Sequence, residues 1–286
     1  MRLVACAAWA AALGLSGAAI AQGQPSADEL VAKNLAARGG TDALAALKSV
    51  KFTGKLIFPG DFQLAYDETR AHEAKGDATR VNASIQGLTL VQAYDGANGW
   101  RINPFQGRRD AEKMTEDEAR SMADSALIDG VLLSAKKEDA KVAYLGREDF
   151  DGTLGYKLKV SQPDGDEFVY LLDPDTFLEI KMTETRRLRG AQQVTEYELG
   201  DYEKVGGVYF PMSIDSWQPG QSNQRQRVII ASAEANVPVP PSMFAQPADA
   251  AKPTLPGPTD KNLQPRDKNE KPADSDVPHP SKPKAE

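Results

Sequence analysis

The stretch VKFTGKLIF, residues 50–58, marks the point at which the hydrophobic pattern changes from helical spacing to strict alternation. In an extended chain, successive side chains point to opposite faces of the sheet. Lysine and threonine take one set of alternate positions here, so that set predicts a polar face. The apolar face of this predicted strand carries Val50, Phe52, Leu56 and Phe58.

The same alternation recurs along most of the remaining chain, with turn signals between the runs. Glycine, asparagine or proline occurs in the turns PGD (59–61), DFDG (149–152), PDGD (163–166) and DPDT (173–176). Short strands at regular spacing predict a mainly β (α+β) domain with an antiparallel meander of about 11–12 strands. The further runs lie at residues 62–66, 81–85, 88–90, 100–102, 142–144, 156–160, 168–172, 178–182, 197–199, 210–214 and 228–230.

The stretch YDGANGWRINPF, residues 94–105, is open to two interpretations. A glycine-rich loop that holds a phosphate follows a strand and opens a helix. Here the glycines are followed by alternating residues that end in Pro104, which indicates a strand. The sequence therefore favours a hairpin turn, with Asp95-Gly96 and Asn98-Gly99 supplying positive φ angles.

Two segments have helical rather than alternating patterns. Ser26, with Glu29 three residues later, predicts an N-cap and a helix over residues 27–38 that ends at two glycines. Thr115 predicts the N-cap of an inserted helical segment over residues 115–136, broken near Asp129-Gly130. A sheet of about a dozen strands curls or closes, and these helices are the candidates to cover its concave face.

The two ends of the chain differ in composition from the middle. Residues 1–21 have one basic residue, an apolar run and a small-residue cleavage site, which together predict a secretory signal peptide. Cys6 is the only cysteine, so the predicted mature chain contains no disulfide. Residues 247–286 contain nine prolines and balanced charges, which predicts a disordered tail. The folded domain is then expected over residues 22–246.

The charge of this middle part argues against one class of partner. The whole chain carries a formal charge of −7, the signal segment contributes +1 and the tail contributes none, so residues 22–246 carry −8. A protein that binds nucleic acid through phosphate contacts presents a basic surface instead. No nucleic-acid partner is therefore expected.

Residues able to carry catalysis or bind metal are sparse. His72 is the only histidine in the predicted domain, which leaves too few ligands for zinc and no triad with a nucleophile elbow. Paired acids such as Glu196 and Glu198 leave a glycosidase-like pair open, although a solvated strand face explains them better. The arginines at 186, 187 and 189 precede Gly190 and are expected at a hairpin end. Contact with an anionic head group stays open there, although solubilising the loop explains these residues better.

Several stretches together resemble the periplasmic outer-membrane lipoprotein-sorting proteins, the LolA/LolB-like family. They are ADELVAKNLAARGG, YDGANGWRINPF, YLGREDFDG, YLLDPDTFLEIK, LGDYEKVGGVYFPMSI and ANVPVPPSMFAQP. The resemblance implies a half-barrel of antiparallel strands lidded by helices on its concave face. It also implies a hydrophobic cavity for lipoprotein acyl chains, and a periplasmic carrier rather than an enzyme.

The alternating apolar residues outnumber the helices available to cover them, so two arrangements stay open. Either an apolar cavity remains and takes an acyl chain or another lipid-like ligand, or the core is filled and the domain serves a structural, sensing or interaction role in the envelope, with envelope proteins as partners. We expect a monomer that needs no cofactor or metal. The cavity hypothesis assigns the wall to Phe52, Leu56, Phe62, Leu64, Tyr66, Ile85, Leu90, Trp100, Ile102, Leu158 and Val160, and the lid side to Met122, Leu127 and Leu132.

Overall fold

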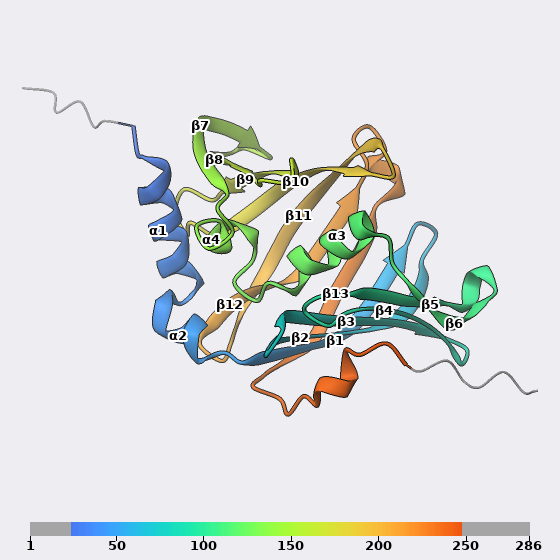
Figure 1. Ribbon diagram of the computed structural model, residues 1–286. Helices are drawn as coiled ribbons and strands as arrows, with labels where there is room; N and C mark the ends of the chain where they lie inside the picture. The colour runs from blue at the N-terminus through green and yellow to red at the C-terminus, as the bar shows by residue number, and fades with distance from the viewer. Residues whose placement is uncertain (1–23, 248–286) are drawn as a thin grey trace, which may run out of the picture. The chain divides into compact units, whose positions relative to one another are not determined.

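A computed structural model describes residues 24–247 of the chain. The predicted signal peptide lies outside the described residues, as does the predicted tail from residue 248 onward. All 13 strands belong to one antiparallel sheet, in the order β6-β5-β4-β3-β2-β1-β13-β12-β11-β10-β9-β8-β7 (Figure 1). The predicted mainly β architecture is therefore confirmed.

Helices occur only at the start of the described chain, in one segment between β6 and β7, and as a few short 3-10 turns. The α-helices are α1 (Ala27–Arg38), α2 (Gly40–Ala46), α3 (Glu116–Ala126) and α4 (Val131–Ser134). The short 3-10 helices are η1 (Pro104–Gln106), η2 (Ser222–Gln224) and η3 (Pro241–Met243). The strands are β1 (Ser49–Phe58), β2 (Phe62–Glu73), β3 (Gly76–Ile85), β4 (Leu88–Tyr94), β5 (Gly99–Asn103), β6 (Arg108–Lys113), β7 (Lys141–Phe150), β8 (Thr153–Ser161), β9 (Glu167–Leu172), β10 (Glu179–Leu188), β11 (Ala191–Val205), β12 (Val208–Trp217) and β13 (Gln226–Ala235).

The sheet consists of two meanders joined by the pairing of β1 with β13. The first meander runs outward from β1 to β6, and the segment with α3 and α4 then leads to β7 at the opposite edge. The second meander returns from β7 to β13, beside β1. The additional strand that sequence analysis missed is β6, whose sequence RRDAEK has no apolar alternation.

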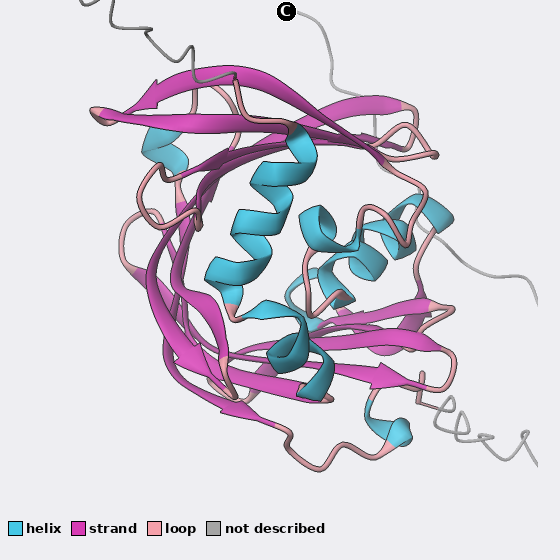
Figure 2. Ribbon diagram, turned by 90° about the vertical axis from the view of Figure 1, so that its left-hand side faces the viewer, coloured by secondary structure: helices cyan, strands magenta, loops and turns pink. Residues whose placement is uncertain are grey.

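The sheet curves around the helices, so that α1, α3 and α4 lie on its concave side (Figure 2). Helix α1 has the predicted bounds, and the hydroxyl of its N-cap Ser26 accepts a hydrogen bond from the Glu29 amide. The inserted segment is broken between α3 and α4, as the Asp129-Gly130 pair predicted. In β1, a side chain at Gly54 would collide with the carbonyl oxygen of Ile229, and the register shifts at this point.

The predicted hairpin at residues 94–99 is confirmed, with a geometry that differs in detail from the expectation. The Asp95 carboxylate accepts hydrogen bonds from the amides of Ala97 and Asn98, at 3.1 and 2.8 Å. Within this turn only Gly96 has a positive φ angle, of 89°. A side-chain acceptor therefore forms the turn that positive φ angles at two dipeptides were expected to form.

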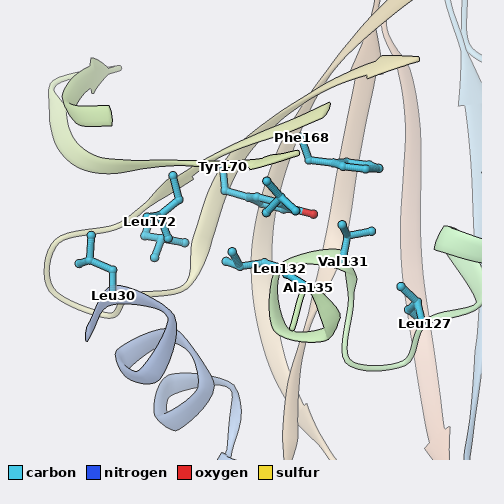
Figure 3. Packing of buried hydrophobic residues seen from close by; sticks show 10 residues of the cluster. Leu30, Leu127, Val131, Leu132, Ala135, Phe168, Tyr170 and Leu172 are labelled. Atoms are coloured by element: carbon cyan, nitrogen blue, oxygen red, sulfur yellow. The ribbon is translucent and has the colours of Figure 1, made fainter. Parts of the chain in front are cut away.

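Two apolar clusters fill much of the space between the sheet and the helices. One lies between α1, α4 and strands β8 and β9, and includes Leu30, Leu132 and Leu172 (Figure 3). The other lies beneath α2 and centres on Phe52 and Phe210, whose ring centroids are 5.4 Å apart in an edge-on contact. The helices are held to the sheet by these contacts.

The opposite, convex face of the first meander is covered by the segment that follows β13. The Phe244 side chain is 1% exposed and packs against Ala71 and Ala78. The Trp100 indole nitrogen donates a hydrogen bond of 2.6 Å to the Phe244 carbonyl oxygen. This segment thus acts as a strap across the face of these strands that the helices do not cover.

Helix α3 begins with a complete capping box. The Thr115 hydroxyl accepts from the Glu118 amide, and the Glu118 carboxylate accepts from the Thr115 amide. Glu118 also pairs with Arg101 at 2.9 Å and with Arg189 at 2.5 Å. Partial burial opposes ionisation, but these hydrogen bonds and charges prevail and lower the pKa of Glu118 to about 2.

We expect Glu118→Gln to lower the free energy of unfolding at pH 7 by about 1–2 kcal/mol, after allowance for solvent screening. A carboxyl whose pKa is lower in the folded state stabilises the fold above its ordinary pKa. The difference from the unmodified protein should therefore shrink as pH falls from about 4.5 towards about 2. Urea titrations at several pH values measure it, with Glu116→Gln in the same turn as the control. A pH-independent difference would contradict this assignment.

Candidate functional site

A pocket of about 260 Å³ lies between the concave face of the sheet and the α3–α4 segment. Its walls come from strands of both meanders, so the pocket exists only because β1 and β13 join them. Apolar side chains form a large part of these walls. They include Leu127 and Leu132 from the helical segment and Met182, Leu199, Ile214 and Ile230 from the sheet.

Charged residues also line the pocket, in three sets that share one composition: phenylalanine, arginine, glutamate and tyrosine. In the first set, Arg70 donates to Glu68 at 2.7 Å, and the Tyr66 hydroxyl donates to the other Glu68 oxygen at 2.8 Å. The Arg70 guanidinium lies 5.7 Å from the ring centroid of Phe52. Alternation in β2 places residues 66, 68 and 70 on the same face, and Glu68 is the direct partner of Phe52 in β1.

The second set joins helix α1 to the sheet. Arg38, the last residue of α1, pairs with Glu179 at 3.3 Å and lies 5.4 Å from the ring centroid of Phe210. The Tyr202 hydroxyl donates to the backbone carbonyl of Glu179 at 2.7 Å and lies 3.3 Å from its carboxylate. Arg38 also donates to the Tyr209 carbonyl at 2.8 Å, which fixes the end of the helix.

The third set lies on β9, β10 and β11. Arg186 forms an ion pair with Glu184 and lies 5.1 Å from the ring centroid of Phe168. The Tyr197 hydroxyl donates to Glu184 at 2.7 Å. We call these three sets the Phe–Arg–Glu–Tyr quartets, and 11 of their 12 residues line the pocket; the twelfth is Tyr66.

Arg186 has two further partners outside its quartet. It donates to Asp124, at the end of α3, at 2.7 Å, and to Asp166 at 2.8 Å. The Asp124 contact links the helical segment directly to β10. Burial raises the pKa of Asp166, and the positive charge of Arg186 opposes that rise.

The hydroxyls of Tyr66, Tyr202 and Tyr170 remain protonated at neutral pH. Burial, reinforced by the neighbouring glutamates, raises the pKa values of Tyr66 and Tyr202 well above the ordinary value. Burial also raises the pKa of Tyr170, whose side chain lies between Phe168 and Leu172 in Figure 3. These groups therefore act as hydrogen-bond donors and not as charged acceptors.

The structure brings only a few of the predicted cavity residues to this pocket. Phe52, Leu127 and Leu132 line it. Other predicted residues are buried outside the pocket. Leu158 and Val160 are 0% exposed, Leu64 is 5% exposed and Met122 is 8% exposed.

A further group lies on the concave face but outside the pocket, towards the hairpin ends. Phe62 is 51% exposed and lies beside Phe58, with ring centroids 6.0 Å apart. Strand pairing extends this apolar strip across β1 to β4. Its half-buried members among the predicted residues are Leu56, Tyr66, Ile85 and Leu90.

The predicted places of Trp100 and Ile102 require correction. Both lie on the convex face, because they pair with Ala93 and Val91 and not with the concave positions of β4. There Trp100 is 1% exposed beneath the C-terminal strap. Period-two alternation identifies an apolar face, but it does not show whether helices or another segment covers that face.

Sequence analysis also missed most of the pocket's polar residues. The expectation that Arg186 would solubilise a hairpin end was wrong, since its side chain is 6% exposed and has three acidic partners. The sequence did carry a signal in YDETR, residues 66–70, where alternate positions hold tyrosine, glutamate and arginine on one strand face. Oppositely charged residues two apart on an otherwise apolar face indicate paired charges in the interior.

Other candidate chemistry is sparse in the part of the chain that the structure describes. His72 forms a hydrogen bond with Asp77 and does not line the pocket. Within residues 24–247, no group of three or more acidic or histidine side chains is arranged to hold a metal ion. No helix in the same range is long and apolar enough to cross a membrane.

Comparison with known proteins gives matches in structure only. No family model matches the sequence, and neither does any curated protein. A DUF1329 family protein from Desulfovibrio piger matches 77% of this chain and 97% of its own, with 10% identity and a TM-score of 0.54. A putative outer membrane lipoprotein-sorting protein domain from Vibrio parahaemolyticus has 13% identity, coverage of 76% and 94%, and a TM-score of 0.51. A LolA superfamily protein from Nitrosomonas europaea has 12% identity, coverage of 78% and 98%, and a TM-score of 0.51.

The class that these features define is an open, curved antiparallel sheet with helices on its concave side. More particularly, this is the LolA-like fold, shared with the three solved structures. The resemblance predicted from the sequence is confirmed at the level of the fold.

Proposed function

We propose that this domain binds an acyl chain, carried by a lipoprotein or another lipid, in the pocket between the sheet and the α3–α4 segment. The observation that carries the proposal is the pocket of about 260 Å³ with leucine, isoleucine and methionine in its walls. Affinity would come from removing the chain from water, and no covalent step is needed. In this proposal the protein acts in the periplasm as a monomeric, non-catalytic carrier.

The size of the pocket limits what it holds in this conformation. Pockets for small molecules usually measure about 300–1,000 Å³, so 260 Å³ suits part of a single chain. The apolar strip from Leu56 to Leu90 continues the concave face beyond the pocket. A longer chain could lie along this strip, and several chains would require the α3–α4 segment to move.

Chain length therefore provides a graded test. Each buried CH₂ contributes about 0.8 kcal/mol, so affinity should rise about tenfold for every two carbons until the available surface is filled. Displacement of a neutral fluorescent probe by acyl chains of 8 to 16 carbons measures this rise. Native mass spectrometry of protein purified from the periplasm would show a co-purified lipid.

We expect Leu199→Trp to lower chain affinity at least tenfold, because the larger side chain fills the pocket. Leu199 is half-buried and lines the pocket opposite the helical segment. Leu154→Trp, at a 48% exposed position on β8, is the matched control and should bind normally. Equal affinities for the two variants would place the chain elsewhere. A lipid-free mass together with no uptake of any chain would favour an interaction domain with a filled core.

A further inference from the structure

The charges around the pocket restrict the chemistry of the ligand's polar group. Three guanidinium groups and four carboxylates line the pocket, which gives its charged lining one net negative charge. Asp166 does not line the pocket, but its carboxylate accepts a hydrogen bond from Arg186 and adds a second negative charge. An anionic group would have to lose its hydration without a net positive environment to replace it.

Most of the charged groups already have partners. Arg38 and Arg186 are 6% exposed and contact acidic or carbonyl oxygens through more than one nitrogen. Glu68 receives hydrogen bonds on both of its oxygens, from Arg70 and Tyr66. The glutamates of the quartets are therefore poor acceptors for a cationic ligand. The quartet arginines already lie over the phenylalanine rings, so these rings cannot form cation–π contacts with a ligand.

Arg70 and Tyr170 keep hydrogen-bond donors that are open to a ligand. Arg70 uses only its Nε atom, so among the described residues its terminal amino groups have no partner. Its side chain is 22% exposed and lines the pocket. The Tyr170 hydroxyl likewise has no hydrogen-bond partner within residues 24–247, and Tyr170 lines the same pocket. Free donors in a lining that disfavours anions suit an uncharged acceptor.

We propose that the pocket selects acyl chains whose polar end is an uncharged ester or amide carbonyl, held by Arg70, over chains that end in a free carboxylate or an amine. This inference rests on the proposed function and specifies its ligand class. A carbonyl oxygen accepts from the guanidinium while Glu68 keeps the arginine neutralised. A carboxylate at the same place would compete with Glu68 for the one positive charge.

Three ligands with the same 12-carbon chain provide the test: 1-dodecanoylglycerol, dodecanoate and dodecylamine, each below its aggregation concentration at pH 8. Displacement of the neutral probe N-phenyl-1-naphthylamine reports binding. We expect the ester to bind at least tenfold more tightly than the other two. At a pH where dodecanoate is largely protonated, its disadvantage should shrink, whereas ester binding should change little.

The double variant Glu68→Gln/Arg70→Met tests the assigned donor without leaving an unpaired buried charge. Ester affinity should fall about tenfold, while dodecanoate affinity stays within twofold. Arg108→Met/Glu112→Gln removes an exposed ion pair on β6 and is the matched control. Arg70→Lys, which keeps the charge and its pairing, is measured alongside in case the double variant fails to fold, and should retain part of the ester preference.

The outcomes separate the two proposals. Ester preference that is lost in the double variant supports both. Equal or tighter binding of dodecanoate or dodecylamine overturns the inference and leaves acyl-chain binding intact. An ester preference that is undiminished in the double variant, or undiminished in Arg70→Lys, does the same. Absence of binding by all three ligands overturns the proposed function itself.

Discussion

Replacing Arg186 with methionine is expected to lower the free energy of unfolding by about 3–5 kcal/mol. Asp166 and Glu184, which pair with this guanidinium, are themselves buried, and Asp124 is mostly covered. Methionine preserves much of the side-chain volume but removes the charge, so three carboxylates would face one another without compensation. Most of the expected loss comes from leaving buried carboxylates unpaired, and less comes from the stabilisation that the ion pairs themselves provide.

The pH dependence of this variant distinguishes electrostatics from lost packing. Burial raises the pKa of Asp166 in the folded state and Arg186 opposes the rise, so removing Arg186 should raise it further. A carboxyl with a raised pKa binds its proton more tightly in the folded state, and its contribution to stability decreases as pH rises above the ordinary carboxyl value. The loss should therefore be larger at pH 8 than at pH 5.

Chemical denaturation of Arg186→Met and Arg187→Met measures this effect with a matched control. Arg187 is the next residue on β10, but its side chain is exposed, so the control should change stability by no more than about 0.5 kcal/mol. Similar losses for the two variants would contradict the buried-charge assignment. A loss that is the same at pH 5 and pH 8 would attribute the effect to packing.

The same residue shows where prediction from the sequence stops. Strand positions follow from alternation, so β1 and its neighbours could be predicted, and capping residues gave the start of α1 and of α3. Strand β6 could not be predicted because its side chains are polar on both faces. Arg186 sits near a hairpin turn in the sequence, but its burial depends on Asp124 and Asp166, which come from other parts of the chain.

The segment that covers each face of a strand also depends on residues far away in the sequence. Phe52 and Trp100 have equally clear alternation patterns, yet one faces the pocket and the other faces the C-terminal strap. The strap has neither a helical nor an alternating hydrophobic pattern, so its sequence does not indicate that it packs on a sheet face. Of the residues predicted to form the cavity wall, Trp100 and Ile102 therefore lie on the convex face instead of the concave one.

The strap explains how a single sheet can leave part of its concave face uncovered. Phe244 buries the convex side of β2 and β3 against Ala71 and Ala78, two small residues that admit a large ring. Strand β5 is anchored there by Trp100 rather than by the helices alone. The first meander thus has a second source of stability, and the apolar strip near Phe62 can remain exposed.

We therefore expect Phe244→Ala to lower the free energy of unfolding by about 3–5 kcal/mol, the usual cost of truncating a buried phenylalanine. Phe105→Ala, the same change at a 45% exposed position, should cost no more than about 0.5 kcal/mol. Equal stabilities in urea would show that the strap is not packed as described.

The strap variant also separates stability from ligand binding, because the sheet lies between the strap and the pocket. Below its unfolding transition, Phe244→Ala should bind acyl chains within about twofold of the unmodified protein, whereas Leu199→Trp should lose binding with little change in unfolding midpoint. Trp100 fluorescence, measured in protein that lacks residues 1–21 and with them Trp9, and with Trp217 replaced by phenylalanine, should shift to the red only in the strap variant. A chain that protects Trp100 from quencher, or that loses affinity in Phe244→Ala, would place the ligand on the convex face and contradict the pocket assignment.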